Sequence, residues 1–212
     1  MNKMNTSIEI ASHLLEIQAI KLSPRKPFTW SSGWKSPIYC DNRLSLSYPG
    51  IRTYIKNQLV ELVKSNFPDV ECIAGVATAG IPQGALLADG LDLPFVYVRS
   101  KPKGHGLENM IEGKITKKQK VVIMEDLIST GGSSLKAAEA LKDAGFKILG
   151  MVAIFTYGFE LAQKNFDQAG IELHTLSNYG DMLVAAKKKG MVSEKDMLQL
   201  KSWRVDPENW GQ

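Results

Sequence analysis

The stretch VVIMEDLISTGGSS, residues 121–134, joins an apolar run to a loop of small residues. The run over 119–126 is typical of a buried β-strand, and SSLKAAEALKDAG (133–145) predicts a helix that ends at Gly145. Between strand and helix, residues 129–133 place hydroxyls and glycines where the free N–H groups of a helix start converge. The stretch therefore predicts a phosphate-binding loop; an ordinary capped helix start with flexible glycines is the alternative for the loop taken alone.

Outward from this stretch, apolar strands alternate with helices. This alternation predicts an α/β fold with a mostly parallel sheet that is covered by helices on both faces. Ligands in such sheets bind beyond the carboxyl ends of the strands. The other strands are predicted at 70–77, 93–99 and 147–157, and helices at 48–67 and 81–90.

The two ends of the chain are predicted to be helical. A helix is expected from about residue 6 to residue 19, because Thr6 and Glu9 have the spacing of a capping box and apolar residues recur at helical spacing. Two more helices are expected at about 178–189 and 193–203. The segment 21–43 shows no sustained period, and long irregular segments in compact domains are often functional.

Composition narrows the class of protein. The chain has 212 residues, of which 44% are hydrophobic, enough for one substantial core. No apolar run approaches the roughly 18 residues of a membrane span, and MNKMNTSIEI lacks the features of a signal peptide, so a cytoplasmic protein without a membrane partner is expected. The net charge of +4 does not demand nucleic acid and suits an anionic small molecule. Cys40 and Cys72 indicate neither a zinc site nor a disulfide.

Two adjacent acids, Glu125 and Asp126, precede the predicted phosphate loop. Carboxylates repel phosphate, so they must face a metal ion, a proton or hydroxyl donors such as a ribose diol. A Walker-type loop needs GxxxxGK[ST], which GVATAGIP (75–82) does not provide, and no GxGxxG occurs. A ligand that carries both a phosphate and a vicinal diol remains, and phosphoribosyl diphosphate is such a molecule.

The sequence EDLISTGGS resembles the phosphoribosyl diphosphate motif of the type I phosphoribosyltransferases. The chain is similar to the orotate phosphoribosyltransferase family over essentially its full length, and the family's motifs occur in the family's order. The further matching stretches are FTWSSGWKSPIYCDNR (28–43), GVATAGIPQGA (75–85) and YVRSKPKGHG (97–106).

This resemblance implies a type I phosphoribosyltransferase fold made of a single domain over 1–212, with a small N-terminal hood from about 1–45 and a mobile loop at about 99–113. It implies transfer of the phosphoribosyl group from phosphoribosyl diphosphate to orotate, which gives orotidine 5′-phosphate and pyrophosphate in de novo pyrimidine (UMP) synthesis. It also implies Mg²⁺ carried by phosphoribosyl diphosphate, and a homodimer in which the loop closes over the neighbouring subunit's site. No nucleic-acid partner and no protein metal ligand are expected.

The same resemblance implies roles for individual residues. Lys103, His105 and Asp126 would be catalytic, and Ser129 would contact orotate. In the segment 99–113, cations crowd into a Gly- and Pro-containing stretch without an apolar face, which is either a solvated hairpin or a lid. The residues expected to bind phosphoribosyl diphosphate are Arg99, Lys103, His105, Glu125, Asp126, Leu127, Ile128, Ser129, Thr130, Gly131, Gly132 and Ser133.

The chain departs from a large branch of the family at three positions. Ala79 and Ser31 stand where that branch has lysines, and Tyr157 stands near the place of an arginine. The partner of the orotate carboxylate is therefore open among Lys35, Arg43 and Ser129. The aromatic residues of 28–43 either stack on the base or anchor the core; they are Phe28, Trp30, Trp34 and Tyr39.

Two other functions fit the same motifs. One is a phosphoribosyltransferase for another base, such as a purine. The other is a regulator that senses phosphoribosyl diphosphate and binds nucleic acid through cations such as Lys114, Lys117, Lys118 and Lys120. The lid with Lys103 and His105 argues against a pure sensor, which would not require it.

Overall fold

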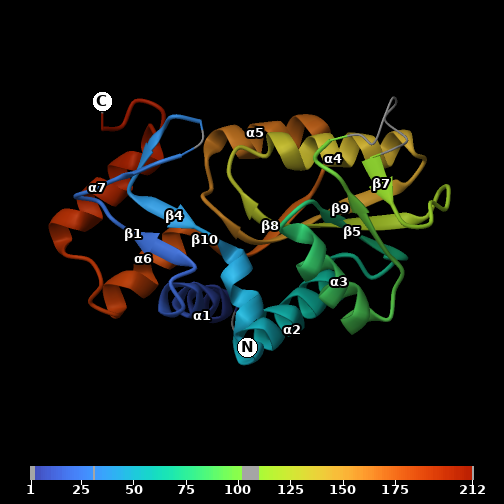
Figure 1. Cartoon of the computed structure of the whole chain (residues 1–212), viewed down its shortest axis with the longest axis horizontal. Helices are drawn as coiled ribbons and strands as arrows, with labels where there is room; N and C mark the ends of the chain where they lie inside the picture. Colours follow the sequence, from blue (N-terminus) through green and yellow to red (C-terminus); the bar gives the residue numbers. More distant parts are fainter. Residues whose placement is uncertain (1–2, 31, 102–109, 212) are drawn as a thin grey trace. The chain divides into compact units, whose positions relative to one another are not determined.

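The computed structural model describes residues 3–30, 32–101 and 110–211 (Figure 1). The predicted loop begins where a long buried strand, β8, ends and a helix, α4, begins. The elements follow in the order α1 (Lys3–Glu16), β1 (Ile20–Leu22), β2 (Phe28–Thr29), β3 (Lys35–Ser36), β4 (Ile38–Cys40), the 3-10 helix η1 (Asn42–Ser47), α2 (Pro49–Asn66), β5 (Cys72–Val76), α3 (Gly80–Leu91), β6 (Phe95–Val98), β7 (Ile111–Glu112), β8 (Lys120–Ile128), α4 (Gly132–Asp143), β9 (Lys147–Thr156), α5 (Glu160–Ala169), β10 (Leu173–Asn178), α6 (Tyr179–Lys188) and α7 (Glu194–Val205).

The chain divides into two compact units. The first comprises Met1–Tyr48 with Ser177–Gln212, and the second comprises Pro49–Leu176. The segment expected to form a hood, about 1–45, falls in the first unit. A single domain with a hood stays a prediction.

A six-stranded sheet, in the order β10-β9-β8-β5-β6-β7, forms the centre of the second unit. Strand β5 pairs in parallel with both β6 and β8, β8 pairs in parallel with β9, and β7 pairs antiparallel with β6. In Figure 1, α4 and α5 cover one face of this sheet, and α2 and α3 cover the other. The predicted mostly parallel, helix-covered sheet is confirmed, and the carboxyl ends of β5, β6 and β8 share one edge.

The central strands form because they are apolar on both faces. All five residues of β5 are buried, and so are Val121–Glu125 of β8. A Cβ atom at Gly150 of β9 would collide with the ring of Phe67, which places the chain just after α2 flush against this strand. Helix α2 ends at Asn66, as expected from Pro68, because the residue before a proline avoids the helical conformation.

The first unit has its own core around Trp203, which is fully buried. Its ring meets Trp30 edge-on at 5.6 Å between ring centroids and lies 5.4 Å from Tyr179. The Trp203 indole N–H donates to the carbonyl of Lys35 at 3.2 Å, and the Trp30 indole N–H donates to that of Ile38 at 3.1 Å. For Trp30, these contacts support the role of core anchor.

Two details of the secondary structure predicted for the N-terminal part of the chain were wrong. Helix α1 already includes Lys3, so Thr6 lies inside the helix and is not its cap. A capping box joins residues three apart, and residues three apart are also neighbours inside any helix. The spacing of Thr6 and Glu9 therefore does not show where the helix begins. The segment 21–43 is also less irregular than expected, because β1 pairs with β4 and β2 with β3, both antiparallel. No helix of the described ranges is both long and apolar enough to cross a membrane.

Candidate active site

The predicted phosphate loop connects β8 to α4. Gly131 precedes the helix with a φ of 83°, a left-handed conformation that favours glycine, and a Cβ atom at Gly132 would meet open space. The Asn165 side chain of α5 donates to the carbonyl of Thr130 at 2.9 Å and holds the loop from outside. The first-turn N–H groups of α4, with Ser133 exposed beside them, form the anion-binding end of a helix.

Not every residue of the predicted loop has a side chain that a ligand could contact. Ile128 is fully buried, and its carbonyl accepts the N–H of Tyr157 at 3.1 Å, so its side chain cannot reach a ligand. Leu127, Ser129 and Thr130 are half-buried.

The two acids of the loop differ sharply in environment. Glu125 is only 7% exposed, whereas Asp126 is half-buried. The Glu125 carboxyl accepts the hydroxyl of Ser134 at 3.3 Å and the backbone N–H of Asp126 at 3.1 Å. Burial, followed by the neighbouring charge of Asp126, raises the pKa of Glu125 to about 8. At neutral pH the carboxyl group of Glu125 is therefore mostly protonated.

The second loop, between β5 and α3, lies directly against the end of β8. A Cβ atom at Gly80 would stand 2.5 Å from the carbonyl oxygen of Met124 and 3.5 Å from Oε2 of Glu125. The N–H of Ala77 donates to the carbonyl of Val98 at 2.8 Å, which ties the loop to β6 as well. Ala79, just before the helix, makes no side-chain capping bond. Small residues thus bring the backbone of this loop next to Glu125.

Arg99 follows β6 at the same edge of the sheet. Its side chain is paired with Glu112 at 3.4 Å, and its N–H donates to the carbonyl of Met110 at 2.7 Å. Because β6 and β7 are antiparallel neighbours, the predicted lid leaves and re-enters the sheet here. Lys103 and His105 lie outside the described residues.

The predicted acceptor segment belongs to the first unit, where several of its polar groups already have partners. Arg43 forms two hydrogen bonds with Asp41, at 2.6 and 2.8 Å, and these bonds lower the pKa of Asp41. The amino group of Lys35 donates to the hydroxyl of Thr29 at 2.9 Å. In the second unit, Tyr157 is buried and stacks on Phe159 at 5.6 Å.

Sequence reasoning missed two residues that support the loop, Ser134 and Asn165. Ser134 is 2% exposed and lies three and four residues before the buried Ala137 and Ala138. A polar residue on the apolar stripe of a helix is a signal that could have identified it. Asn165 gave no such signal, because α5 is mostly polar.

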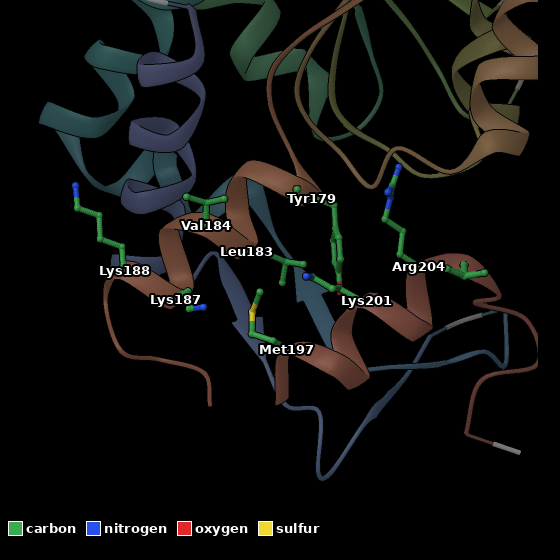
Figure 2. A pocket seen from close by; sticks show the side chains of 10 residues that line it. Tyr179, Leu183, Val184, Lys187, Lys188, Met197, Lys201 and Arg204 are labelled. Carbon is green, nitrogen blue, oxygen red and sulfur yellow. The ribbon is translucent and has the colours of Figure 1, made fainter. Parts of the chain in front are cut away.

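Each unit of the described chain also contains a cavity. Figure 2 shows one of about 710 Å³ between α6 and α7 of the first unit, with Leu183 and Met197 among its lining residues and Lys187 and Lys201 beside them. Another, of about 990 Å³, lies between α4 and α5. Of the predicted site residues that the structure describes, these two cavities include only Gly132, so the loops at the carboxyl ends of the strands define the candidate site better.

Known proteins resemble this chain in sequence and in fold. The family model described as "Phosphoribosyl transferase domain" matches residues 48–172. A protein of Cytophaga hutchinsonii named orotate phosphoribosyltransferase is 58% identical over 207 residues, covering 98% of this chain and 99% of its own. The orotate phosphoribosyltransferase structure of Aeropyrum pernix has a TM-score of 0.75 at 28% identity, over 87% of this chain and 99% of that one.

A longer protein shares the fold. The structure of Leishmania donovani UMP synthase has a TM-score of 0.80 at 23% identity, over 95% of this chain, which spans 42% of that chain. The family model and the solved structures agree on the fold, and the 58% identical relative, matched over nearly the full length of both chains, shows that the chain belongs to the orotate phosphoribosyltransferase family.

Proposed function

We propose that the protein transfers the phosphoribosyl group of phosphoribosyl diphosphate to orotate, giving orotidine 5′-phosphate and pyrophosphate in the synthesis of UMP. The observation that carries this proposal is the 58% identity, over nearly the full length of both chains, to a protein named orotate phosphoribosyltransferase. The predicted phosphate loop at the end of β8 supports the proposal without reference to sequence identity.

In this proposal the substrate lies along the carboxyl edge of the sheet. Its 5′-phosphate accepts hydrogen bonds from the first turn of α4 and the hydroxyls of Thr130 and Ser133, because the helix dipole favours an anion there. Asp126 accepts hydrogen bonds from the ribose diol. The backbone around Gly80 faces the diphosphate, where small residues let the chain approach closely.

The chemistry requires stabilisation of charge more than a nucleophile from the protein. The bond from C1 of the ribose to the diphosphate breaks, and its electron pair leaves with pyrophosphate. The orotate nitrogen forms the new bond at C1, and its proton passes to the departing pyrophosphate or to water. Cations around the leaving group stabilise this step more than the ground state. We assign that role to Lys103 of the lid, with Arg99 near its base, and we assign to His105 a proton or hydrogen bond for the leaving oxygen.

The substrate is proposed to be the Mg²⁺ complex of phosphoribosyl diphosphate, with the ion held by the diphosphate and ribose oxygens. Within the described ranges, no group of three or more His, Cys, Asp and Glu side chains is arranged to hold a metal ion. A Mg²⁺ ion that arrives with the substrate would need few ligands from the protein.

The active form is proposed to be a cytoplasmic homodimer, in which each lid serves the neighbouring site. Ser129 is the proposed contact for the orotate carboxylate. Arg43 is the weaker candidate because Asp41 already pairs with it in two hydrogen bonds. Neither nucleic acid nor a membrane is a proposed partner.

The test is the change in ultraviolet absorbance of orotate when phosphoribosyl diphosphate is added, with and without Mg²⁺. Consumption of orotate that depends on both is expected, and adenine and hypoxanthine should not replace orotate. The variant Asp126→Asn serves as the negative control. Turnover of a purine alone would assign another base, and RNA or DNA binding that falls steeply with salt, without turnover, would favour the regulator.

A further inference from the structure

The carboxyl group of Glu125 is a junction between the two ends of the phosphate loop. One oxygen, Oε1, accepts the hydroxyl of Ser134, and the other, Oε2, accepts the backbone N–H of Asp126. Asp126 is the first residue after Glu125, and Ser134 lies in the first turn of α4. A single buried side chain thus connects the start of the loop to the helix turn at its end.

The third side of this junction is the other loop of the site. Gly80 stands so close that a Cβ atom there would lie 3.5 Å from Oε2 of Glu125 and 2.5 Å from the carbonyl of Met124. Gly80 of the β5–α3 loop, the backbone at the end of β8 and the side chain of Ser134 at the start of α4 therefore meet at one carboxyl group. A shift of Glu125 would displace both loops, because closely packed interiors transmit small displacements.

Ser134 is the residue that fixes this carboxyl group from the helix side. It is 2% exposed, so its hydroxyl cannot contact a ligand in the loop directly. Its neighbour Ser133 is exposed and belongs to the predicted phosphate site. The two adjacent serines have different surroundings, one facing the ligand side and one facing Glu125.

We propose that Ser134 is a positioning residue for phosphoribosyl diphosphate. It holds Glu125, which in turn holds the backbone of Asp126, so that the Asp126 carboxylate and the first-turn N–H groups of α4 keep the spacing of a ribose diol and its 5′-phosphate. Glu125 is then held from within the protein, next to the Asp126 carboxylate that meets the diol. This inference rests on the proposed function, because it names how the same site recognises its sugar phosphate.

The experiment compares Ser134→Ala with Ser177→Ala. Ser177 belongs to the first unit, is 1% exposed and donates to the carbonyl of Ser7 at 2.8 Å, so its replacement also deletes a buried hydroxyl but outside the proposed machinery. For Ser134→Ala we expect the KM for phosphoribosyl diphosphate to rise roughly tenfold, with the KM for orotate within about twofold. Ser177→Ala should change Tm by a similar amount and leave both KM values within about twofold.

A direct binding measurement makes the outcome independent of turnover. Calorimetric titration of each purified protein with the Mg²⁺ complex of phosphoribosyl diphosphate should give a Kd raised about tenfold in Ser134→Ala alone. Equal Kd values in Ser134→Ala and the unmodified chain, with a lowered Tm, would overturn the proposal and leave Ser134 a structural residue. If the unmodified chain bound the sugar but consumed no orotate, the proposed function would fail while the titration still decided the role of Ser134.

A second variant protects the test against misfolding. Ser134→Cys keeps the shape of the side chain and replaces the hydroxyl with a weak donor. It is expected to show the same rise in Kd as Ser134→Ala, with a smaller loss of Tm. A Kd unchanged in Ser134→Cys would count against the proposal in the same way.

Discussion

Gly131 packs so tightly against Phe166 that a Cβ atom at residue 131 would lie 2.7 Å from the Cε2 atom of the ring. Phe166 belongs to α5 and is 1% exposed, so the ring cannot move aside freely. The φ of 83° at Gly131 adds strain for any other residue. We expect Gly131→Ala to lower the free energy of unfolding by about 1–3 kcal/mol and to weaken binding of phosphoribosyl diphosphate, measured by denaturant titration and calorimetry.

Gly50→Ala is the matched control for that substitution. Gly50 lies in the first turn of α2, and a Cβ atom there meets nothing within 4 Å. Alanine is the better helix former, so this variant should be as stable as the unmodified chain or up to about 1 kcal/mol more stable. A Gly131→Ala protein as stable as the Gly50→Ala protein would show that the ring of Phe166 can yield.

The pKa of Glu125 predicts how stability depends on pH. In the unfolded chain this carboxyl ionises near its ordinary value of 4.5, whereas in the folded chain it keeps its proton until about pH 8. Between these values the folded state binds more protons, so its contribution to stability is full below pH 4.5 and is lost as pH rises to about 8. Glu125→Gln cannot ionise and should flatten this part of the profile.

The measurement is Tm from pH 4.5 to 8.5 for both proteins. The side-chain amide introduced by Glu125→Gln would place a donor near the N–H of Asp126, so this substitution is expected to shift Tm by a constant amount. The slopes, and not the Tm values at one pH, are therefore compared. Identical slopes would mean that Glu125 is ionised in the folded protein at neutral pH.

Much of this fold could be predicted because its central strands are buried on both faces and carry unbroken apolar runs. The edge strand β10 (Leu173–Asn178) was missed because only Leu176 and Ser177 of its residues are buried. Helix α5 was missed for a similar reason, since Ala162 and Phe166 are its buried residues and most of the others are polar. Strands of two or three residues, such as β2 and β3, are too short to have a period at all.

The candidate site was predictable in its loops and not in its interior contacts. Parallel strands place their carboxyl ends at one edge, so the order of the motifs along the chain already brought the loops after β5, β6 and β8 together. The different surroundings of Glu125 and Asp126 were not predictable from two adjacent acids. They follow from Gly80 and Ser134, which approach Glu125 only in the folded chain.

Gly80 is expected to tolerate no side chain. In Gly80→Ala the new methyl group would meet the carbonyl of Met124 at 2.5 Å, and a backbone atom of a central strand cannot move without breaking the sheet. We expect a loss of about 1–3 kcal/mol in the free energy of unfolding and a KM for phosphoribosyl diphosphate raised more than the KM for orotate. Unchanged kinetics in a folded Gly80→Ala protein would show that this loop does not contact the diphosphate.

The lid is tested by Lys103→Ala. If Lys103 stabilises the charge of the departing pyrophosphate, its loss should cost about 2–4 kcal/mol of transition-state stabilisation, or roughly 30- to 1,000-fold in kcat. Lys101→Ala removes the same charge from the same segment and should have a much smaller effect. Near-normal kcat in Lys103→Ala would remove the lid lysine from the mechanism.

A lid that serves the neighbouring subunit makes a prediction about mixed dimers. When Lys103→Ala chains and Asp126→Asn chains are mixed at equal amounts and allowed to exchange, about half of the dimers contain one chain of each kind. In each such dimer, the Lys103→Ala chain keeps Asp126 and receives an intact lid from its neighbour, so about a quarter of all sites should be active. A lid that closed over its own subunit would leave every site defective, because one site would lack the lysine and the other the aspartate. Native mass spectrometry on chains with tags of different mass verifies the exchange, and kcat per site decides between the two arrangements.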